Sequence, residues 1–318
     1  MRLFLVVVTV LAAVYLKGDA DLSLLFMADV VGLKEDSFEG KKVWIVGASG
    51  GIGAALAEEL STRGAKVVLS ARSGEKLESV AEKCMKEGAS EKPSVLVFDA
   101  LDPETRKSTT VRDADILILN AGRAQRMPAM KTPLETTREI MELNFFAMVD
   151  IAKTWAENYS GTQGHVVVTS SISGKIGTPI GSSYSASKFA LHGYFDALRV
   201  ELAKKNVSVS IACPGPVVSD IGKHIHGLPE SPAEEAFQHK MPTKRCAYLM
   251  GVAINHKMPE VWISEQPFLL FTAILQYFPR LGVFLAKNIG GKRLDAFEQG
   301  KDIYDTKTYF SLGAKGNK

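Results

Sequence analysis

A tyrosine and a lysine four residues apart, Tyr184 and Lys188, have the types and spacing that suit proton transfer. Positions i and i+4 of a helix share one face, so the two side chains would be neighbours. A phenol has an unperturbed pKa of about 10, and an ammonium held beside it stabilises the phenolate and lowers that pKa. The pair could therefore act as a proton donor, although the same spacing also occurs on ordinary surface helices.

Two serines precede this pair, where an apolar run ends. The run 166–168 predicts a buried strand, Ser170 and Ser171 follow it, and a helical pattern covers 189–202. A serine at the end of that strand could hydrogen-bond the same oxygen as Tyr184. The spacing to Tyr184 favours Ser171 for this role.

A glycine-rich stretch near the N-terminus predicts a second kind of site. The run 43–46 predicts a short strand, Gly-Ala-Ser-Gly-Gly-Ile-Gly fills 47–53, and 54–63 predicts a helix. In such a unit the glycines let the backbone approach a pyrophosphate, and the helix N-terminus offers free N–H groups. The glycine spacing differs from the usual dinucleotide fingerprint, but its context predicts a dinucleotide-binding turn.

Together these stretches resemble the short-chain dehydrogenase/reductase (SDR) superfamily over about 41–264. The resemblance includes the glycines of the loop, Asn-Ala-Gly at 120–122 and Pro-Gly at 214–215. It implies an α/β fold with a Rossmann-type, doubly wound parallel sheet, and an oxidoreductase acting on CH–OH or carbonyl groups. It also implies a catalytic tetrad of Asn144, Ser171, Tyr184 and Lys188.

The resemblance assigns a role to each member of the tetrad. Tyr184 would donate the proton to the carbonyl oxygen, and Lys188 would lower the phenol pKa and hold the nicotinamide ribose. Ser171 would orient and polarise the carbonyl, and Asn144 would hold a water that links the lysine to solvent. Besides Tyr184 and Lys188, the implied cofactor site comprises Gly47, Ser49, Gly51, Ile52, Gly53, Arg72, Asp99, Asn120, Ala121, Gly122, Pro214, Gly215 and Val217.

The end of the second predicted strand, 66–70, bears on the choice of coenzyme. An acidic residue there would bind the adenosine ribose, as NAD enzymes require. This chain instead has Ala71 followed by Arg72, whose guanidinium can pair with a 2′-phosphate. We therefore expect NADP(H), unless Arg72 merely stacks on adenine and leaves the preference weak.

Composition restricts the remaining possibilities. A chain of 318 residues with 46% hydrophobic residues suits one large α/β domain with a terminal extension, or two small domains. The net charge of +3 is too small to indicate nucleic-acid binding. Three distant cysteines, Cys84, Cys213 and Cys246, form neither a disulfide framework nor a metal-binding spacing. The loop 219–241, which includes His224, His226 and His239, is expected to shape the substrate site and not to bind a metal.

The two ends of the chain indicate contact with a membrane. Residues 1–27 form an apolar anchor or signal segment, 28–264 the catalytic domain, and 265–318 a C-terminal extension. The apolar run 3–16 is shorter than the roughly 20 residues of a spanning helix. It could be an anchor, with 22–27 lying at the interface, or a signal peptide cleaved after the small residues Gly18 and Ala20.

The resemblance favours an anchor in the endoplasmic reticulum membrane, and the alternative is a secreted or lumenal protein after cleavage. The apolar segment 268–278 is followed by basic residues. It could lie in the membrane interface, line a lipophilic pocket or form a homodimer face.

The sequence therefore predicts an NADPH-dependent reductase of lipophilic ketones or aldehydes, such as steroids, retinals or xenobiotic carbonyls. Three alternatives share some of these features. They are an NAD-dependent alcohol or hydroxysteroid dehydrogenase working in the oxidative direction, a fatty-acyl or sphingoid ketone reductase, and a cofactor-binding scaffold without turnover.

Overall fold

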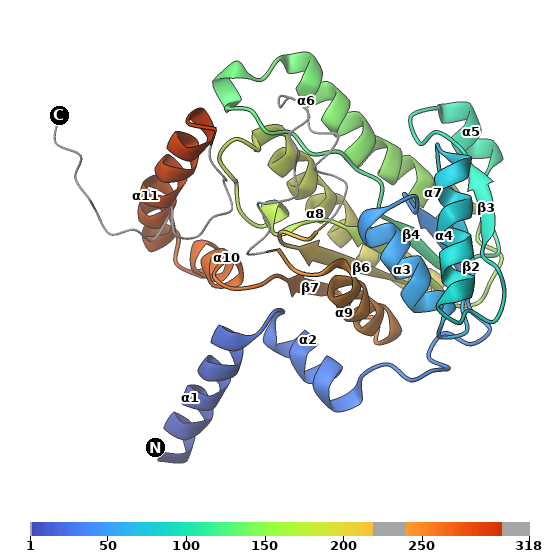
Figure 1. The fold of residues 1–318 in the computed structure, drawn as a ribbon, viewed down its shortest axis with the longest axis horizontal. Helices are drawn as coiled ribbons and strands as arrows, with labels where there is room; N and C mark the ends of the chain where they lie inside the picture. The colour runs from blue at the N-terminus through green and yellow to red at the C-terminus, as the bar shows by residue number, and fades with distance from the viewer. Residues whose placement is uncertain (1, 219–239, 301–318) are drawn as a thin grey trace.

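The fold is built on one parallel sheet of seven strands. In the computed structural model, which describes residues 2–218 and 240–300, the strand order is β3-β2-β1-β4-β5-β6-β7 (Figure 1). The strands are β1 Lys42–Val46, β2 Lys66–Ala71, β3 Ser94–Val97, β4 Ile116–Leu119, β5 Gly164–Thr169, β6 Val207–Pro214 and β7 Glu260–Ile263. The order reverses between β1 and β4, where a crevice at the carboxyl ends of the strands is a common ligand site.

Alternating side chains of the strands supply two hydrophobic cores. On β1, Val43 and Ile45 belong to one core, and Trp44 and Val46 to the other. Successive residues of a strand point to opposite faces, so a strand covered on both faces is apolar throughout. The uninterrupted apolar runs of the sequence follow from this arrangement.

Helices cover both faces of the sheet (Figure 1). The core on one face includes α3 (Gly51–Ser61), α4 (Gly74–Lys86) and α9 (Thr243–Asn255). The core on the other face includes α7 (Met148–Asn158) and α8 (Ser182–Leu202). The short helix α5 spans Pro103–Ser108, and α6 spans Leu134–Met141. This is the doubly wound α/β fold that the sequence predicts.

The sequence pattern over 134–157 predicts one long helix, but the structure contains a π-helical segment within it. Between α6 and α7, the segment η3 (Glu142–Ala147) has π-helical geometry and carries the buried Asn144. Such segments widen the helix by one residue per turn and are frequent at functional sites. Side-chain periodicity does not reveal this widening, so the sequence predicted one regular helix.

The N-terminal segment packs against the last strand. Helix α1 (Arg2–Lys17) projects from the body, and the chain then pairs Ala20 with Ile263 in an antiparallel bridge (Figure 1). Asp21 caps α2 (Leu22–Phe26) by accepting bonds from the N–H groups of Ser23 and Leu24. Its other oxygen accepts from the Trp262 N–H at 2.8 Å.

The predicted interfacial stretch 22–27 is therefore partly internal. Leu24 and Leu25 are buried in the same core as α3 and α9, so these two side chains do not face a membrane. The following segment η1 (Met27–Val31) is π-helical. None of the described helices combines the length and hydropathy that crossing a membrane requires.

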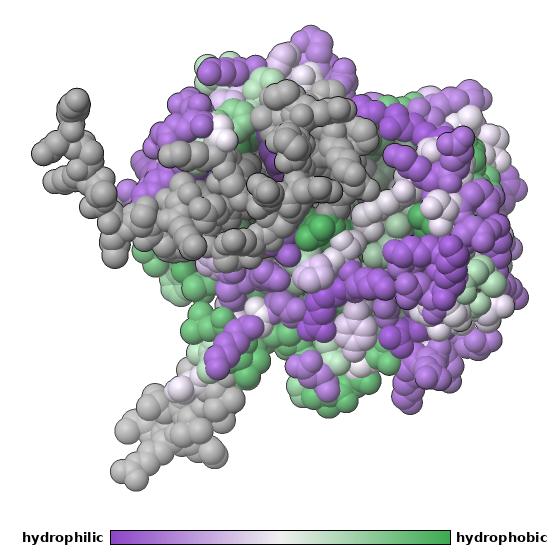
Figure 2. All heavy atoms as spheres, in the orientation of Figure 1, coloured by the Kyte–Doolittle hydropathy of each residue, from purple (hydrophilic) through white to green (hydrophobic). Residues whose placement is uncertain are grey.

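Two helices extend from β7 beside this N-terminal segment. Helix α10 spans Phe268–Tyr277, and α11 begins at Pro279 and ends at Glu298. The phenol of Tyr15 in α1 donates to the main-chain oxygen of Leu269 at 3.2 Å. Hydrophobic residues gather over this edge of the molecule (Figure 2). The three histidines predicted in the loop 219–241 lie outside the described residues, as does the tail 301–318.

Candidate active site

A cavity of about 750 Å³ runs along the carboxyl ends of the strands. Its walls comprise the β1–α3 loop, the segment after β4, the segment after β5, and residues of α8, α10 and α11. Most of the predicted site residues line it: Gly47, Ser49, Gly51, Ile52, Arg72, Asp99, Asn120, Ala121, Gly122, Ser171, Tyr184, Lys188, Pro214, Gly215 and Val217. Asn144 and Gly53 do not line it, for reasons given below.

The glycine loop has the shape that a pyrophosphate needs. Gly47 has a φ of +88°, and a Cβ built there would lie 2.6 Å from the Ala121 Cα. Helix α3 begins at Gly51 after Gly50, which provides no side-chain cap. Ser49, Gly51 and Ile52 line the cavity, so the first N–H groups of the helix are available to an anion there. The loop therefore fits the phosphates of a dinucleotide.

Gly53 supports the loop from beneath. A Cβ at this position would lie 2.2 Å from the main-chain oxygen of Gly47 and 2.7 Å from the Asn120 amide nitrogen. Asn120 donates to that same oxygen at 3.0 Å. Both residues thus hold the loop, and the expected cofactor contact of Gly53 is replaced by a packing role.

One end of the cavity carries two exposed basic residues. Arg72 follows β2, and Lys76 lies in the first turn of α4; both line the cavity with Ser73, the cap of that helix. The sequence prediction included Arg72 but missed Lys76. Its only signal was its place in the first turn of the helix after Arg72. Asp99 lines the same region and accepts a hydrogen bond from the Leu101 N–H at 2.9 Å.

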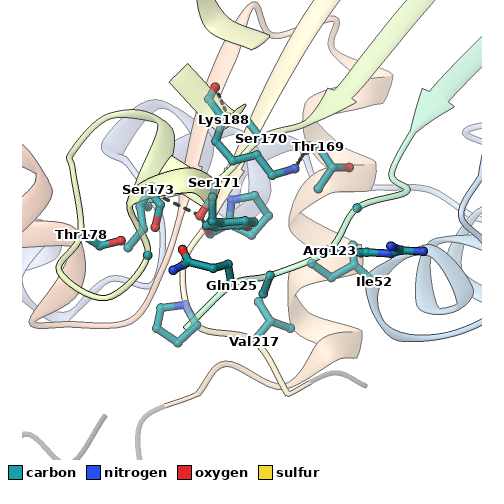
Figure 3. Close-up of a pocket in the computed structure, with 18 of the residues that line it drawn as sticks. Ile52, Arg123, Gln125, Thr169, Ser170, Ser171, Ser173, Thr178, Lys188 and Val217 are labelled. Carbon is teal, nitrogen blue, oxygen red and sulfur yellow. Dashed lines mark hydrogen bonds between the residues drawn. The ribbon is translucent and has the colours of Figure 1, made fainter. Parts of the chain in front are cut away.

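The Tyr-Lys pair lies on α8, which begins at Ser182 and not at the predicted residue 189. Lys188 Nζ lies 5.6 Å from the centroid of the Tyr184 ring. It donates to the main-chain oxygen of Thr169 at 2.8 Å (Figure 3). Burial lowers the pKa of Lys188 from 10.5 to about 8. The ammonium is therefore held beside the phenol with one fixed partner.

The two serines after β5 have different roles. Ser170 donates to the main-chain oxygen of Lys188 at 3.3 Å. Ser171 donates to the main-chain oxygen of Pro214 at 3.1 Å and accepts from the Ser173 N–H at 3.1 Å (Figure 3). Both line the cavity. Ser170 thus supports the lysine helix, while Ser171 is held from two sides.

Asn144 lies behind the cavity wall. Its Oδ1 accepts from the Arg123 N–H at 2.8 Å, and its Nδ2 donates to the Arg123 carbonyl and to Ser187 Oγ, both at 3.0 Å. The side chain is fully buried. It therefore fixes the segment after Gly122 against α8, and any part in proton transfer would not use the bonded side-chain atoms.

The other end of the cavity is largely apolar. Its lining comprises Phe268, Phe271, Leu275, Leu285, Ala286 and Ile289 from α10 and α11. Gln125, Ser173 and Thr178 add polar groups near Ser171 (Figure 3). The segment 268–278 was predicted as a possible pocket lining, and Phe268, Phe271 and Leu275 belong to it. The α11 residues and the three polar residues were not predicted, because their place in the cavity depends on tertiary packing.

A buried cluster behind α8 contains three residue types that can bind metals. The ligand atoms of His192, Cys213 and Glu260 lie within 4.8 Å of one another. However, the Lys175 ammonium lies 3.1 Å from Glu260 Oε1, and Trp262 Nε1 donates to the same oxygen at 2.6 Å. Burial also raises the pKa of the Cys213 thiol. The carboxylate already has its partners, so the cluster is a structural ion-pair network.

Known proteins similar to this chain belong to the family that its motifs resemble. The family model described as short chain dehydrogenase matches residues 41–227. Dehydrogenase/reductase SDR family member 7 of Homo sapiens is 37% identical over 311 residues, which cover 94% of this chain and 91% of the relative. The chain belongs to the short-chain dehydrogenase/reductase family. The family predicted from the motifs is confirmed, and with it an SDR oxidoreductase whose fold binds a nicotinamide cofactor.

Other SDR proteins show the breadth of the similarity. Hydroxysteroid 11-beta-dehydrogenase 1-like protein of Gallus gallus is 37% identical over 194 residues, covering 58% of this chain and 67% of the relative. A crystal structure of a short chain dehydrogenase from Burkholderia cenocepacia J2315 in complex with NADP matches with a TM-score of 0.62 and 22% identity. It covers 76% of this chain and 95% of its own, and it supports the fold alone.

Proposed function

We propose that this chain is an NADP(H)-dependent reductase of lipophilic ketones and aldehydes. The observation that carries the proposal is the arrangement of the cavity. Tyr184, Lys188 and Ser171 lie between the glycine loop, which fits a dinucleotide, and an apolar chamber. Such an apolar chamber favours a carbonyl on an apolar body.

Arg72 and Lys76 favour the phosphorylated coenzyme. Both are basic, exposed and part of the cavity wall next to the N-terminus of α4. A 2′-phosphate there would meet two cations and the positive end of a helix. An NAD ribose would find no acidic acceptor at Ala71 or Arg72.

The residues of the chain would perform the proton step of carbonyl reduction. When bound, the reduced nicotinamide supplies a hydride to the carbonyl carbon. Tyr184 donates its phenolic proton to the carbonyl oxygen. Ser171 orients this oxygen by a hydrogen bond once its hydroxyl turns from the Pro214 carbonyl to the substrate. Lys188, protonated near neutral pH, stabilises the phenolate left on Tyr184.

The test is NADPH oxidation by the detergent-solubilised protein with apolar ketones and aldehydes. Tyr184→Phe is expected to lower turnover by about 10²–10⁴ because the proton donor is lost, while NADPH binding is retained. Arg72→Ala is expected to weaken NADPH more than NADH. Turnover that survives in Tyr184→Phe would refute the assigned acid, and an unchanged coenzyme preference in Arg72→Ala would refute the role of Arg72.

We further propose that the protein contacts a membrane, in keeping with an endoplasmic reticulum location. Exposed apolar side chains occur in three groups: Leu11, Val14 and Leu16 on α1; Phe26, Val30 and Val31 on α2 and η1; and Tyr277, Phe278, Leu281, Val283 and Phe284 at α10 and α11. The contacts of residues 15–21 with β7 and α10 favour retention of the segment over its cleavage after Ala20.

A homodimer is a further proposal. Phe146 of η3 and Phe189 and Val200 of α8 are exposed apolar residues on elements that contact each other. A second copy of the chain could cover this surface. Analytical ultracentrifugation of Val200→Asp against the unmodified protein would test it.

A further inference from the structure

A buried amide in the cavity wall lacks half of its hydrogen bonds. Gln125 is 2% exposed and lines the cavity. Its Nε2 donates to the main-chain oxygen of Met127 at 2.7 Å and to Thr132 Oγ1 at 2.9 Å. Its Oε1 is buried without a hydrogen-bond partner among the residues that the structure describes. Most buried polar groups in native proteins have a partner, so this oxygen calls for a donor from elsewhere.

The orientation of the amide follows from its neighbours. The main-chain oxygen of Met127 can only accept, so the atom that faces it must be the nitrogen. The Thr132 hydroxyl donates to the Pro128 carbonyl at 3.0 Å, which leaves its oxygen to accept from Nε2. Exchanging the amide oxygen and nitrogen would place two acceptors against each other at the Met127 carbonyl, and the Thr132 hydroxyl would have to leave Pro128 to donate to the amide oxygen. The acceptor Oε1 therefore stays turned away from these partners.

The position of Gln125 associates it with the substrate. It lies three residues after Gly122, on a segment tied to the far wall by the Met127 N–H, which donates to the Ile180 carbonyl at 2.9 Å. In the close-up its amide extends towards the part of the cavity where Ser171, Ser173 and Thr178 lie (Figure 3). The chamber beyond is lined by apolar side chains of α10 and α11.

We propose that Gln125 is a specificity-determining residue whose Oε1 accepts a hydrogen bond from a hydroxyl group of the substrate. The preferred substrates are then lipophilic ketones or aldehydes that carry a hydroxyl in addition to the reacting carbonyl. This inference rests on the proposed reductase function and narrows it. A polyene aldehyde or a plain hydrocarbon ketone would leave the acceptor unpaired, and a site built around a substrate hydroxyl discriminates strongly against the analogue that lacks it.

The test uses matched pairs of ketones. A series of straight-chain methyl ketones carries a hydroxyl at successive carbons, and each is paired with the unsubstituted ketone of the same length. The ratio of kcat/KM for hydroxylated over plain ketone is measured in the unmodified protein and in Gln125→Met, a substitution of similar length without donor or acceptor. For the best-placed hydroxyl we expect this ratio to fall about 10-fold in Gln125→Met.

Thr132→Val is the matched control. It removes one acceptor of Nε2 and leaves Oε1 in place, so the ratio should stay at the value of the unmodified protein. If the kcat/KM ratio falls equally in Thr132→Val, the effect comes from a general change in the cavity wall and not from Oε1 of Gln125. That result would overturn the proposal. A ratio that is the same in Gln125→Met and the unmodified protein for every ketone would overturn it as well.

A binding measurement separates this inference from the function on which it rests. Tyr184→Phe protein saturated with NADP is titrated with each pair of ketones by calorimetry. Tighter binding of a hydroxylated ketone, lost when Gln125→Met is added, supports the inference even if the unmodified protein oxidises no NADPH, in which case the reductase proposal fails alone. Equal binding of both members of every pair overturns the inference, even where turnover confirms the reductase and even if Gln125→Met does not fold.

Discussion

At the scale of single residues, Lys188 is buried at a position that disfavours its positive charge. Burial favours the neutral amine and lowers its pKa to about 8. At neutral pH the group is still mainly protonated, and its bond to the Thr169 carbonyl directs it below the ring of Tyr184. The charge that assists the phenol is therefore lost within the range of ordinary assays.

This gives a pH prediction for the reductive reaction. We expect kcat/KM for ketone reduction to fall as pH rises through about 8, because the neutral amine no longer stabilises the phenolate. The measurement is a pH profile with saturating NADPH, with Lys188→Met as the comparison. In that variant kcat/KM should be low at every pH, and its fall near pH 8 should be absent. If the fall near pH 8 persists there, it reports the titration of another group.

Residue types and spacing predicted much of this site but not all of it. Tyr184 and Lys188 could be paired from sequence because a helix fixes the relation of i and i+4. Gln125 gave no such signal, since its importance comes from the partners that its nitrogen finds and its oxygen lacks. Lys76 and the apolar lining from α11 were missed for the same reason, because they reach the cavity only through tertiary packing, whereas the apolar character of 268–278 did suggest a pocket lining in α10.

At the scale of elements, Glu260 ties β7 to α8 and to the segment after Ser171. Its carboxylate meets Lys175 at 3.1 Å, His192 Nδ1 at 3.2 Å and Trp262 Nε1 at 2.6 Å. Burial raises the pKa of this carboxyl, but the hydrogen bonds from His192, Trp262 and Lys175 outweigh burial and hold it at about 2. The ionised form is therefore favoured in the folded protein.

Glu260→Gln should accordingly reduce stability in a pH-dependent way. The usual pKa is 4.5 and the folded value about 2, so the contribution, up to about 3 kcal/mol, is fully present above pH 4.5. It is lost as pH falls towards 2. Urea unfolding of both proteins across this range would show the difference shrinking on acidification.

Glu87→Gln serves as the control, since its ion pair with Lys244 at 3.3 Å lies on the surface and such pairs contribute little. If Glu260→Gln changes unfolding no more than this control does, the carboxylate is not a structural tie.

Apart from the start of α8, at Ser182 and not at 189, the predicted strands and helices agree with the structure to within a few residues, with two exceptions of physical interest. The π-helical segment around Asn144 has no recognisable sequence pattern. Asn144 within it is bonded to Arg123 and Ser187, which are distant in the sequence. The burial of Leu24 and Leu25 depends on elements far along the chain, because α2 contacts α9 and the preceding Ala20 pairs with Ile263 of β7. Local apolar character alone suggested a membrane-facing stretch there.

At the scale of the whole molecule, exposed apolar residues occur on α1, α2, η1, α10 and α11, and Figure 2 shows hydrophobic surface along the lower margin of the body. Two of these helices, α10 and α11, also line the apolar chamber of the cavity. If this margin contacts a lipid layer, a carbonyl compound dissolved in that layer would enter the chamber between apolar residues of α10 and α11.

We expect a variant with Leu281→Asp and Phe284→Asp to bind lipid vesicles about 10-fold more weakly, because two apolar side chains leave the lipid phase. Co-sedimentation with phosphatidylcholine vesicles containing an anionic lipid measures this. Val97→Asp is the control, since Val97 is exposed on β3 at the opposite edge of the sheet from β7. Equal loss in both variants, or no loss in either, would contradict the membrane contact.

The pairing of Ala20 with Ile263 also determines when the N-terminal segment can complete its folding during synthesis. At about 5–20 residues per second, roughly 10–50 s pass on the ribosome between the synthesis of these two partners. During that interval the buried face of α2 lacks α9, the helix that it contacts in the folded protein, and the apolar helix ahead of it is already outside the exit tunnel. An early encounter of that helix with a lipid surface would tether the nascent chain and shield these residues from other chains. Completion of the fold would then wait for the last strand of the sheet.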